Sequence, residues 1–294
     1  MRTLAAAAIL AISAAPALAY TDAGDRLFPA TILLPQIGPS DDLYMTPSTM
    51  PLYGASGAHD RLTNTSVVYN KTITERFSMG IEDGWNQLQQ PGSAGGTAYG
   101  WQNLETTAKY LAILDPEHEF QLSLGIDREW GGTGAKSIAN PVGATTPQLL
   151  FGKGMNELPW PDLKPFAIVG AFGYQIADAH TRADQILTSI AIEYSIPYLE
   201  AKVADVALPD FLRRVTPMIE FQFTTPGSPA RGAQSAGLIA PGFNYAGEGW
   251  ELGLEALIPA TKGAGSGPGV IAQLHFSLDY LFPDTIGRPI FARH

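Results

Sequence analysis

The chain of 294 residues has no cysteine, and its 28 acidic against 18 basic residues give a formal net charge of −10. The absence of cysteine excludes a disulfide-stapled scaffold and a thiolate metal site, and the acidic balance argues against nucleic-acid binding, which needs a basic surface. The 31 glycines and 23 prolines indicate many turns and few helices.

Residues 1–19 have the pattern of a secretory signal peptide. Arg2 supplies the positive start, residues 4–14 form a short apolar run, and Ala17-Leu18-Ala19 is a small-x-small cleavage site. We therefore expect the mature chain to begin at Tyr20. No later run approaches the roughly 18 apolar residues of a transmembrane helix. The mature protein is then either soluble or crosses a membrane as a closed barrel.

Residues 20–42 show no clear periodicity and contain three prolines followed by the pair Asp41-Asp42. We interpret this stretch as a periplasmic lead-in or a partial plug, and terminal disorder is the alternative.

Residues 43–282 contain about twelve segments in which apolar and polar side chains alternate, as they do on the two faces of a strand. In residues 187–199, Ile190 and Ile192 alternate with Ala191 and Glu193. The alternation is clearest in residues 270–280, whose length matches the roughly 9–11 residues that a tilted strand needs to cross a bilayer.

Three prolines, Pro197, Pro217 and Pro241, fall inside predicted strands. Proline cannot donate to a ladder and a closed barrel has no free edge. We therefore expect a bulge at each of them, or a strand that ends earlier.

The connections alternate between longer and shorter segments. The longer set is 54–62, 86–100, 131–147, 175–186, 225–236 and 260–269, and the shorter set is 71–75, 114–118, 154–163, 200–211 and 247–249. Outer-membrane barrels have long external loops, short periplasmic turns and an even strand number. The sequence thus predicts an all-β fold, a transmembrane antiparallel up-and-down β-barrel of about twelve strands, with residues 283–294 as a C-terminal periplasmic tail. The rival hypothesis, motivated by the prolines, is a soluble periplasmic or secreted β-sandwich that binds a ligand.

Tryptophans lie at the ends of predicted strands: Trp85, Trp101, Trp130 and Trp250. Since tryptophan prefers the boundary between lipid and water, we interpret them as interface aromatics.

The polar faces of the strands carry the candidate pore-lining residues. They are Glu105, Lys109, Asp127, Glu129, Glu193, Glu220, Gln222, Glu251, Glu255, Gln273, His275 and Asp279. Charge on the lipid side is costly, so these side chains are expected to face the lumen. Two interpretations stay open: a structural network that fills the barrel, or a narrow acidic pore that favours cations or hydroxylated solutes.

Several stretches resemble the family of outer-membrane proteins named for the meta-pathway of phenol degradation. They are residues 69–77, 80–84, 102–107, 215–223, 269–280 and 282–290. The resemblance covers most of the mature chain as patches, and it departs from many outer-membrane barrels because the chain runs past Tyr280 to His294. It implies an outer-membrane β-barrel that takes up small compounds, aromatic ones among them. No functional residue is carried over from it.

Signatures of enzymes and cofactors are not found. There is no nucleophile elbow, phosphate loop or His-Glu-x-x-His pair. His118 lies between two glutamates in a turn without further ligands spaced to bind a metal. A surface esterase would need a serine and a histidine facing each other at one rim, and the sequence places no such pair. We therefore expect neither an enzyme nor a cofactor or metal. The expected partners are outer-membrane lipid, the barrel-assembly machinery and a small solute.

Overall fold

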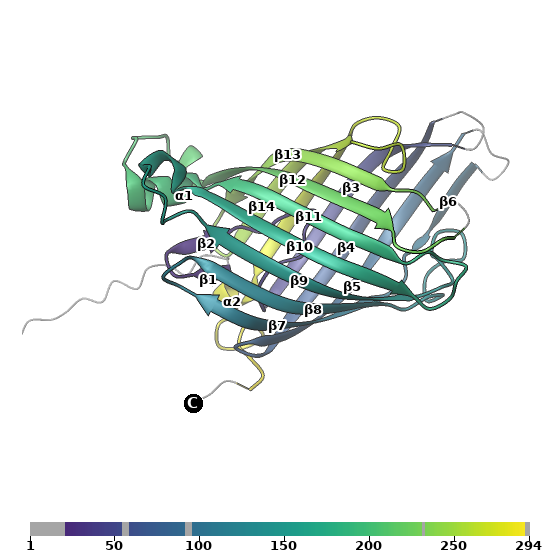
Figure 1. The fold of residues 1–294 in the computed structure, drawn as a ribbon, viewed down its shortest axis with the longest axis horizontal. Helices are drawn as coiled ribbons and strands as arrows, with labels where there is room; N and C mark the ends of the chain where they lie inside the picture. Colours follow the sequence, from purple (N-terminus) through teal and green to yellow (C-terminus); the bar gives the residue numbers. More distant parts are fainter. Residues whose placement is uncertain (1–20, 55–58, 92–95, 231–232, 292–294) are drawn as a thin grey trace, which may run out of the picture.

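The computed structural model describes residues 21–54, 59–91, 96–230 and 233–291, so the predicted signal peptide lies outside the described residues. One antiparallel sheet dominates (Figure 1). Its strands are β3 (Asp42–Tyr53), β4 (His59–Thr74), β5 (Phe77–Gln90), β6 (Gly96–Trp101), β7 (Glu105–Asp115), β8 (Phe120–Glu129), β9 (Ala144–Gly154), β10 (Phe166–Ala177), β11 (Gln185–Tyr194), β12 (Val215–Pro226), β13 (Ala236–Ala246), β14 (Trp250–Pro259) and β15 (Gly269–Ser277).

Each strand pairs with its sequence neighbours, and β15 pairs back onto β3 to close the sheet. Both β6 and β7 pair with β5: β7 pairs with its first half and β6 with its second half. Together they form one interrupted strand. The result is a closed antiparallel barrel of twelve strands, as the alternation predicted.

Shorter elements gather at one end of the barrel, where both ends of the described chain also lie (Figure 1). They are the hairpin of β1 (Thr21–Ala23) and β2 (Arg26–Phe28), the helices α1 (Ile196–Tyr198) and α2 (Leu278–Leu281), and the helical turns η1 (Pro161–Leu163), η2 (Leu199–Val203) and η3 (Leu212–Arg214). We call this the terminal end and the opposite one the loop end. No helix among the described residues is long and apolar enough to cross a membrane.

The two faces of the strands differ in the way the alternation predicted. Along β14, Glu251 and Glu255 are buried inside the barrel, whereas Leu252, Leu254 and Ile258 are 42–44% exposed on the outside. Large apolar side chains are exposed in the same way on most other strands. A continuous exposed apolar surface of this kind marks contact with a partner or a membrane. In a sandwich the apolar faces of the strands would meet in a dry interior, whereas here Ile192 of β11 is 39% exposed.

The prolines are accommodated without bulges. Pro47, Pro147 and Pro241 each lie where the ladder to one neighbouring strand omits two consecutive pairs and then resumes in the same register. Pro217 lies beyond Met218, where the pairing of β12 with β11 ends. Pro197 is not in a strand at all, because β11 stops at Tyr194 and Pro197 belongs to α1.

Two predicted strand ends are wrong. The last strand stops at Ser277, since the next residues turn into α2 and the Leu278 N–H donates to the Asp41 carbonyl (2.8 Å) instead of continuing a ladder. The predicted pore residue Asp279 therefore lies in α2, outside the barrel wall. The segment predicted to end at Trp85 continues to Gln90, because β4, β5 and β6 extend past their neighbours at the loop end.

If the outer face contacts lipid, a charge there has a cost that depends on depth. We predict that Leu254→Arg, at the middle of β14, lowers the free energy of unfolding in lipid vesicles by about 2–4 kcal/mol. The matched control Thr225→Arg is also exposed and lies near the loop end of β12, and it should cost about 0–1 kcal/mol. Denaturant titration followed by tryptophan fluorescence measures both, and equal costs would contradict the assignment.

Candidate functional site

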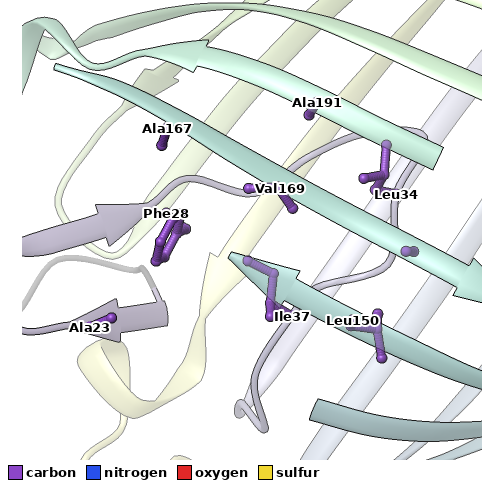
Figure 2. Packing of buried hydrophobic residues seen from close by; sticks show 9 residues of the cluster. Ala23, Phe28, Leu34, Ile37, Leu150, Ala167, Val169 and Ala191 are labelled. Atoms are coloured by element: carbon purple, nitrogen blue, oxygen red, sulfur yellow. The ribbon is translucent and has the colours of Figure 1, made fainter. Parts of the chain in front are cut away.

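Residues 23–41, which we call the interior segment, lie inside the barrel. Phe28, Leu34 and Ile37 pack against the inner faces of β9, β10 and β11 (Figure 2). The wall is shaped to receive them: a side chain at Gly152 would begin 2.7 Å from Ile37 and 3.0 Å from Phe28. Ile32 packs in a second cluster with residues of β3, β13, β14 and β15. Apolar contact thus fixes the segment on opposite sides of the lumen.

Carboxylates of the wall bind the backbone of the interior segment. Glu220 accepts hydrogen bonds from the N–H groups of Ile32 (2.7 Å), Leu33 (2.8 Å) and Leu34 (3.2 Å). Glu251 accepts one from Ala30 N–H (2.9 Å). Both carboxylates are fully buried. Hydrogen bonds to a charged group are stronger than neutral ones, so these contacts hold the segment against the wall.

Donors of the wall bind the carbonyl groups of the same segment. The Lys109 ammonium donates to the carbonyls of Gln36 and Gly38, the Gln222 amide to Leu33 (2.8 Å) and the Asn244 amide to Ala30 (2.8 Å). The interior segment therefore forms hydrogen bonds in both directions with the wall and does not add a strand to the sheet.

Arg26 closes the terminal end. Its guanidinium is buried, donates to Glu119 (3.2 Å) and to the Pro165 carbonyl (3.1 Å), and lies 3.9 Å from the centre of the Tyr198 ring. Burial and the neighbouring Glu119 carboxylate raise the pKa of Tyr198 to about 12, so its hydroxyl stays protonated at neutral pH.

Most of the predicted pore residues lie on the inner faces of the strands. Glu193, Glu220, Gln273 and His275 are buried there, as are Glu251, Glu255 and Lys109, whereas Glu105, Asp127, Glu129 and Gln222 are half-buried. His275 bonds Asp42 (2.8 Å) and stacks on Tyr44, which reinforces the joint between β15 and β3. Their part in conduction stays a prediction.

The sequence reasoning missed several interior residues. Glu82 is in phase with the inner residues of β5, so the period-two pattern alone would have found it. Arg182 comes from the loop after β10 and reaches Glu129 (2.6 Å) and Gln175 (3.1 Å). No local pattern identifies such a loop residue.

A cavity of about 260 Å³, which we call the vestibule, lies between the interior segment and the loop end. Leu33 and Pro35 of the interior segment contribute to its lining, and strands β7 to β12 supply the rest. The other lining residues are Glu105, Asp127, Glu129, Thr146, Gln148, Ala171, Gly173, Gln175, Leu187, Ser189 and Gln222.

The predicted interface aromatics lie at two levels. Trp85 and Trp101 face each other across β5 and β6 with ring centres 5.4 Å apart, and both are exposed near the loop end, as is Trp130. Trp250 begins β14 at the terminal end, beside Tyr245. Trp85 lies within its strand and not at its end, and the role of the four tryptophans at a lipid boundary stays a prediction.

His118 lies outside the barrel wall, in the turn between β7 and β8. His118 is exposed and bonds Asp115 (2.8 Å), which raises its pKa. Within the described ranges, no group of three or more His, Cys, Asp or Glu side chains could hold a metal ion.

Contrary to expectation, a serine and a histidine do meet at the loop end. The His59 Nδ1 and the Ser266 Oγ are 2.9 Å apart. The pair is exposed, no carboxylate of the described residues bonds the ring, and the Ser266 N–H is taken by the Pro51 carbonyl. A nucleophilic serine needs an oriented base and an oxyanion hole, so this pair alone supports no hydrolytic mechanism.

No family model and no curated protein matches the chain, so the resemblance to the phenol-degradation family is not confirmed. Solved structures do match. An outer-membrane channel from Pseudomonas putida F1 has a TM-score of 0.57 and 12% identity over 85% of this chain and 99% of that one. The KdgM porin in complex with disordered oligogalacturonate and the NanC porin each have a TM-score of 0.50, at 11% and 9% identity, over 80% of this chain and 98% of theirs. At these identities the likeness shows the fold alone: the chain is built as outer-membrane β-barrel channels are.

Proposed function

We propose that the protein is an outer-membrane channel that passes a small polar solute. The observation that carries the proposal is the division of the closed barrel into an apolar outer face and a polar lumen. Lipid requires such an outer face, because backbone groups within the hydrocarbon must pair inside the wall and side chains that face lipid must be largely apolar. The shared fold with known channels supports the same conclusion.

The location follows from the same features. We propose that the terminal end faces the periplasm and the loop end the outside, since long external loops and periplasmic chain ends are usual in these barrels. Export by a signal peptide and insertion by the barrel-assembly machinery belong to this proposal.

The proposed solute is polar and not aromatic. None of the thirteen residues that line the vestibule is aromatic, and eight of them carry a carboxylate, amide or hydroxyl group. Aromatic uptake was implied only by the resemblance to a family for which no model matches. The vestibule therefore favours solutes that form hydrogen bonds.

The interior segment acts as a plug in this proposal. It occupies the lumen below the vestibule. Side chains of β7, β12, β13 and β14 hold it by hydrogen bonds, and it packs against β9, β10 and β11. Passage then depends on the gap that the segment leaves or on its displacement.

Conductance tests the channel. In planar bilayers we expect small, steady currents from the full mature chain and severalfold larger ones after deletion of residues 23–38, because the lumen is then open. Liposome swelling with neutral sugars should change in the same direction. A folded, heat-modifiable barrel that conducts in neither form would contradict the proposal.

Displacement of the plug can be followed by cysteine labelling, since the chain has no cysteine of its own. Leu34 is 4% exposed and its N–H binds Glu220. We expect Leu34→Cys to react slowly with a hydrophilic maleimide, and Glu220→Ala added to it to speed labelling about tenfold or more, because hydrogen bonds to a charged acceptor are lost.

The matched control for labelling is Glu75→Ala, which removes the same group from the turn between β4 and β5. Equal rates with Glu220→Ala and with the control would mean that the carboxylate does not hold the segment.

A further inference from the structure

We infer that the vestibule is a binding site for a small hydroxylated amine, whose ammonium group lies against Glu105 and Asp127 and whose hydroxyl groups bond Thr146 and Ser189. This inference rests on the proposed channel and names the class of solute that it takes.

The first observation is a row of like charges. Glu82 on β5 lies directly opposite Glu105 on β7, which lies directly opposite Glu129 on β8. Asp127 is on the same inner face, two residues from Glu129. Like charges directly opposite each other destabilise a sheet. A folded protein keeps such a row only where cations, hydrogen-bond donors or bound protons offset the repulsion.

The protein itself supplies donors to all of these carboxylates except one. Arg182 pairs with Glu129 (2.6 Å), the Gln148 amide donates to Asp127 (2.7 Å), and Glu82 is hydrogen-bonded by Ser66. Among the described residues, no group donates a hydrogen bond to the Glu105 carboxylate, on which the Arg182 guanidinium acts only electrostatically. Lys109, the nearest ammonium on the same strand, instead donates to carbonyls of the interior segment.

The second observation concerns two hydroxyl groups on the other side of the vestibule. Thr146 and Ser189 are each only 7% exposed, line the vestibule, and make no side-chain hydrogen bond to any part of the described chain. Each hydroxyl belongs to a largely buried residue, opens into the vestibule and has no partner in the protein, so it is available to bond a ligand there.

The two observations together define the chemistry of the ligand. An ammonium group offers three donors and a compact charge, which suits an unpaired carboxylate. Hydroxyl groups of the solute can both donate to and accept from Thr146 and Ser189. A bare metal ion fits less well, because the described residues include no cluster that could coordinate one.

The test uses D-glucosamine, which carries an ammonium group and hydroxyls, and D-glucose, which differs by lacking the charge. Calorimetric titration of the full mature chain in detergent should show that glucosamine binds and that glucose binds at least about tenfold more weakly, as expected for the loss of a charged hydrogen bond.

Variants assign the site. Glu105→Gln should weaken glucosamine binding about tenfold while leaving the weak glucose binding unchanged, and Ser189→Ala should weaken both. Glu75→Gln, the same change in an exposed turn, should alter neither. Glu105→Gln also removes a like charge from the row, so the barrel should fold at least as well, and heat-modifiable migration checks this.

Binding and conduction separate the two proposals. Equal affinity for glucosamine and glucose, or an unaltered glucosamine affinity in Glu105→Gln, overturns the amine site even where currents are observed. Selective binding without any current in bilayers supports the site and counts against the channel.

Discussion

The joint between β3 and β15 is the constraint on which the rest of the structure depends. A sheet in lipid cannot leave a row of N–H and C=O groups unpaired, so its first and last strands must meet. Buried His275 strengthens this joint through Asp42 and by stacking on Tyr44. Closure also creates an enclosed interior. Every second residue of each strand points into it, and residues 23–41 occupy the same space.

The outer face could be predicted from the sequence because a lipid-facing strand needs only an apolar residue at every second position, and this pattern is local. The ends of strands could not, since they depend on tertiary contacts. Leu278 continues the apolar phase of β15, yet its N–H bonds the Asp41 carbonyl and the chain turns into α2. The bulge predicted at Pro241 was wrong for a related reason. The ladder there omits two pairs and then continues, and the sequence gives no sign of such a gap.

The sequence predicted which side chains face the interior, but it could not predict which groups they bind there. Glu220 binds Ile32, which is 188 positions away, and Lys109 binds the Gln36 carbonyl. No spacing rule connects residues so far apart. Near the terminal end the carboxylates form a structural network around the interior segment, which is the first of the two interpretations left open by the sequence. Near the loop end Glu105 faces the vestibule without a hydrogen-bond donor, and a role in a pore stays a prediction.

This difference in depth constrains how a solute could pass. Three backbone N–H groups of the interior segment donate to Glu220, so moving the segment would remove them, whereas Glu251 would keep its bond from the Asn244 amide. A buried, unpaired charge is far more costly than a lost neutral hydrogen bond. A solute that displaces the segment must therefore bring donors or water with it. An amine held at Glu105 could meet this requirement at Glu220, whereas an apolar solute of the same size could not.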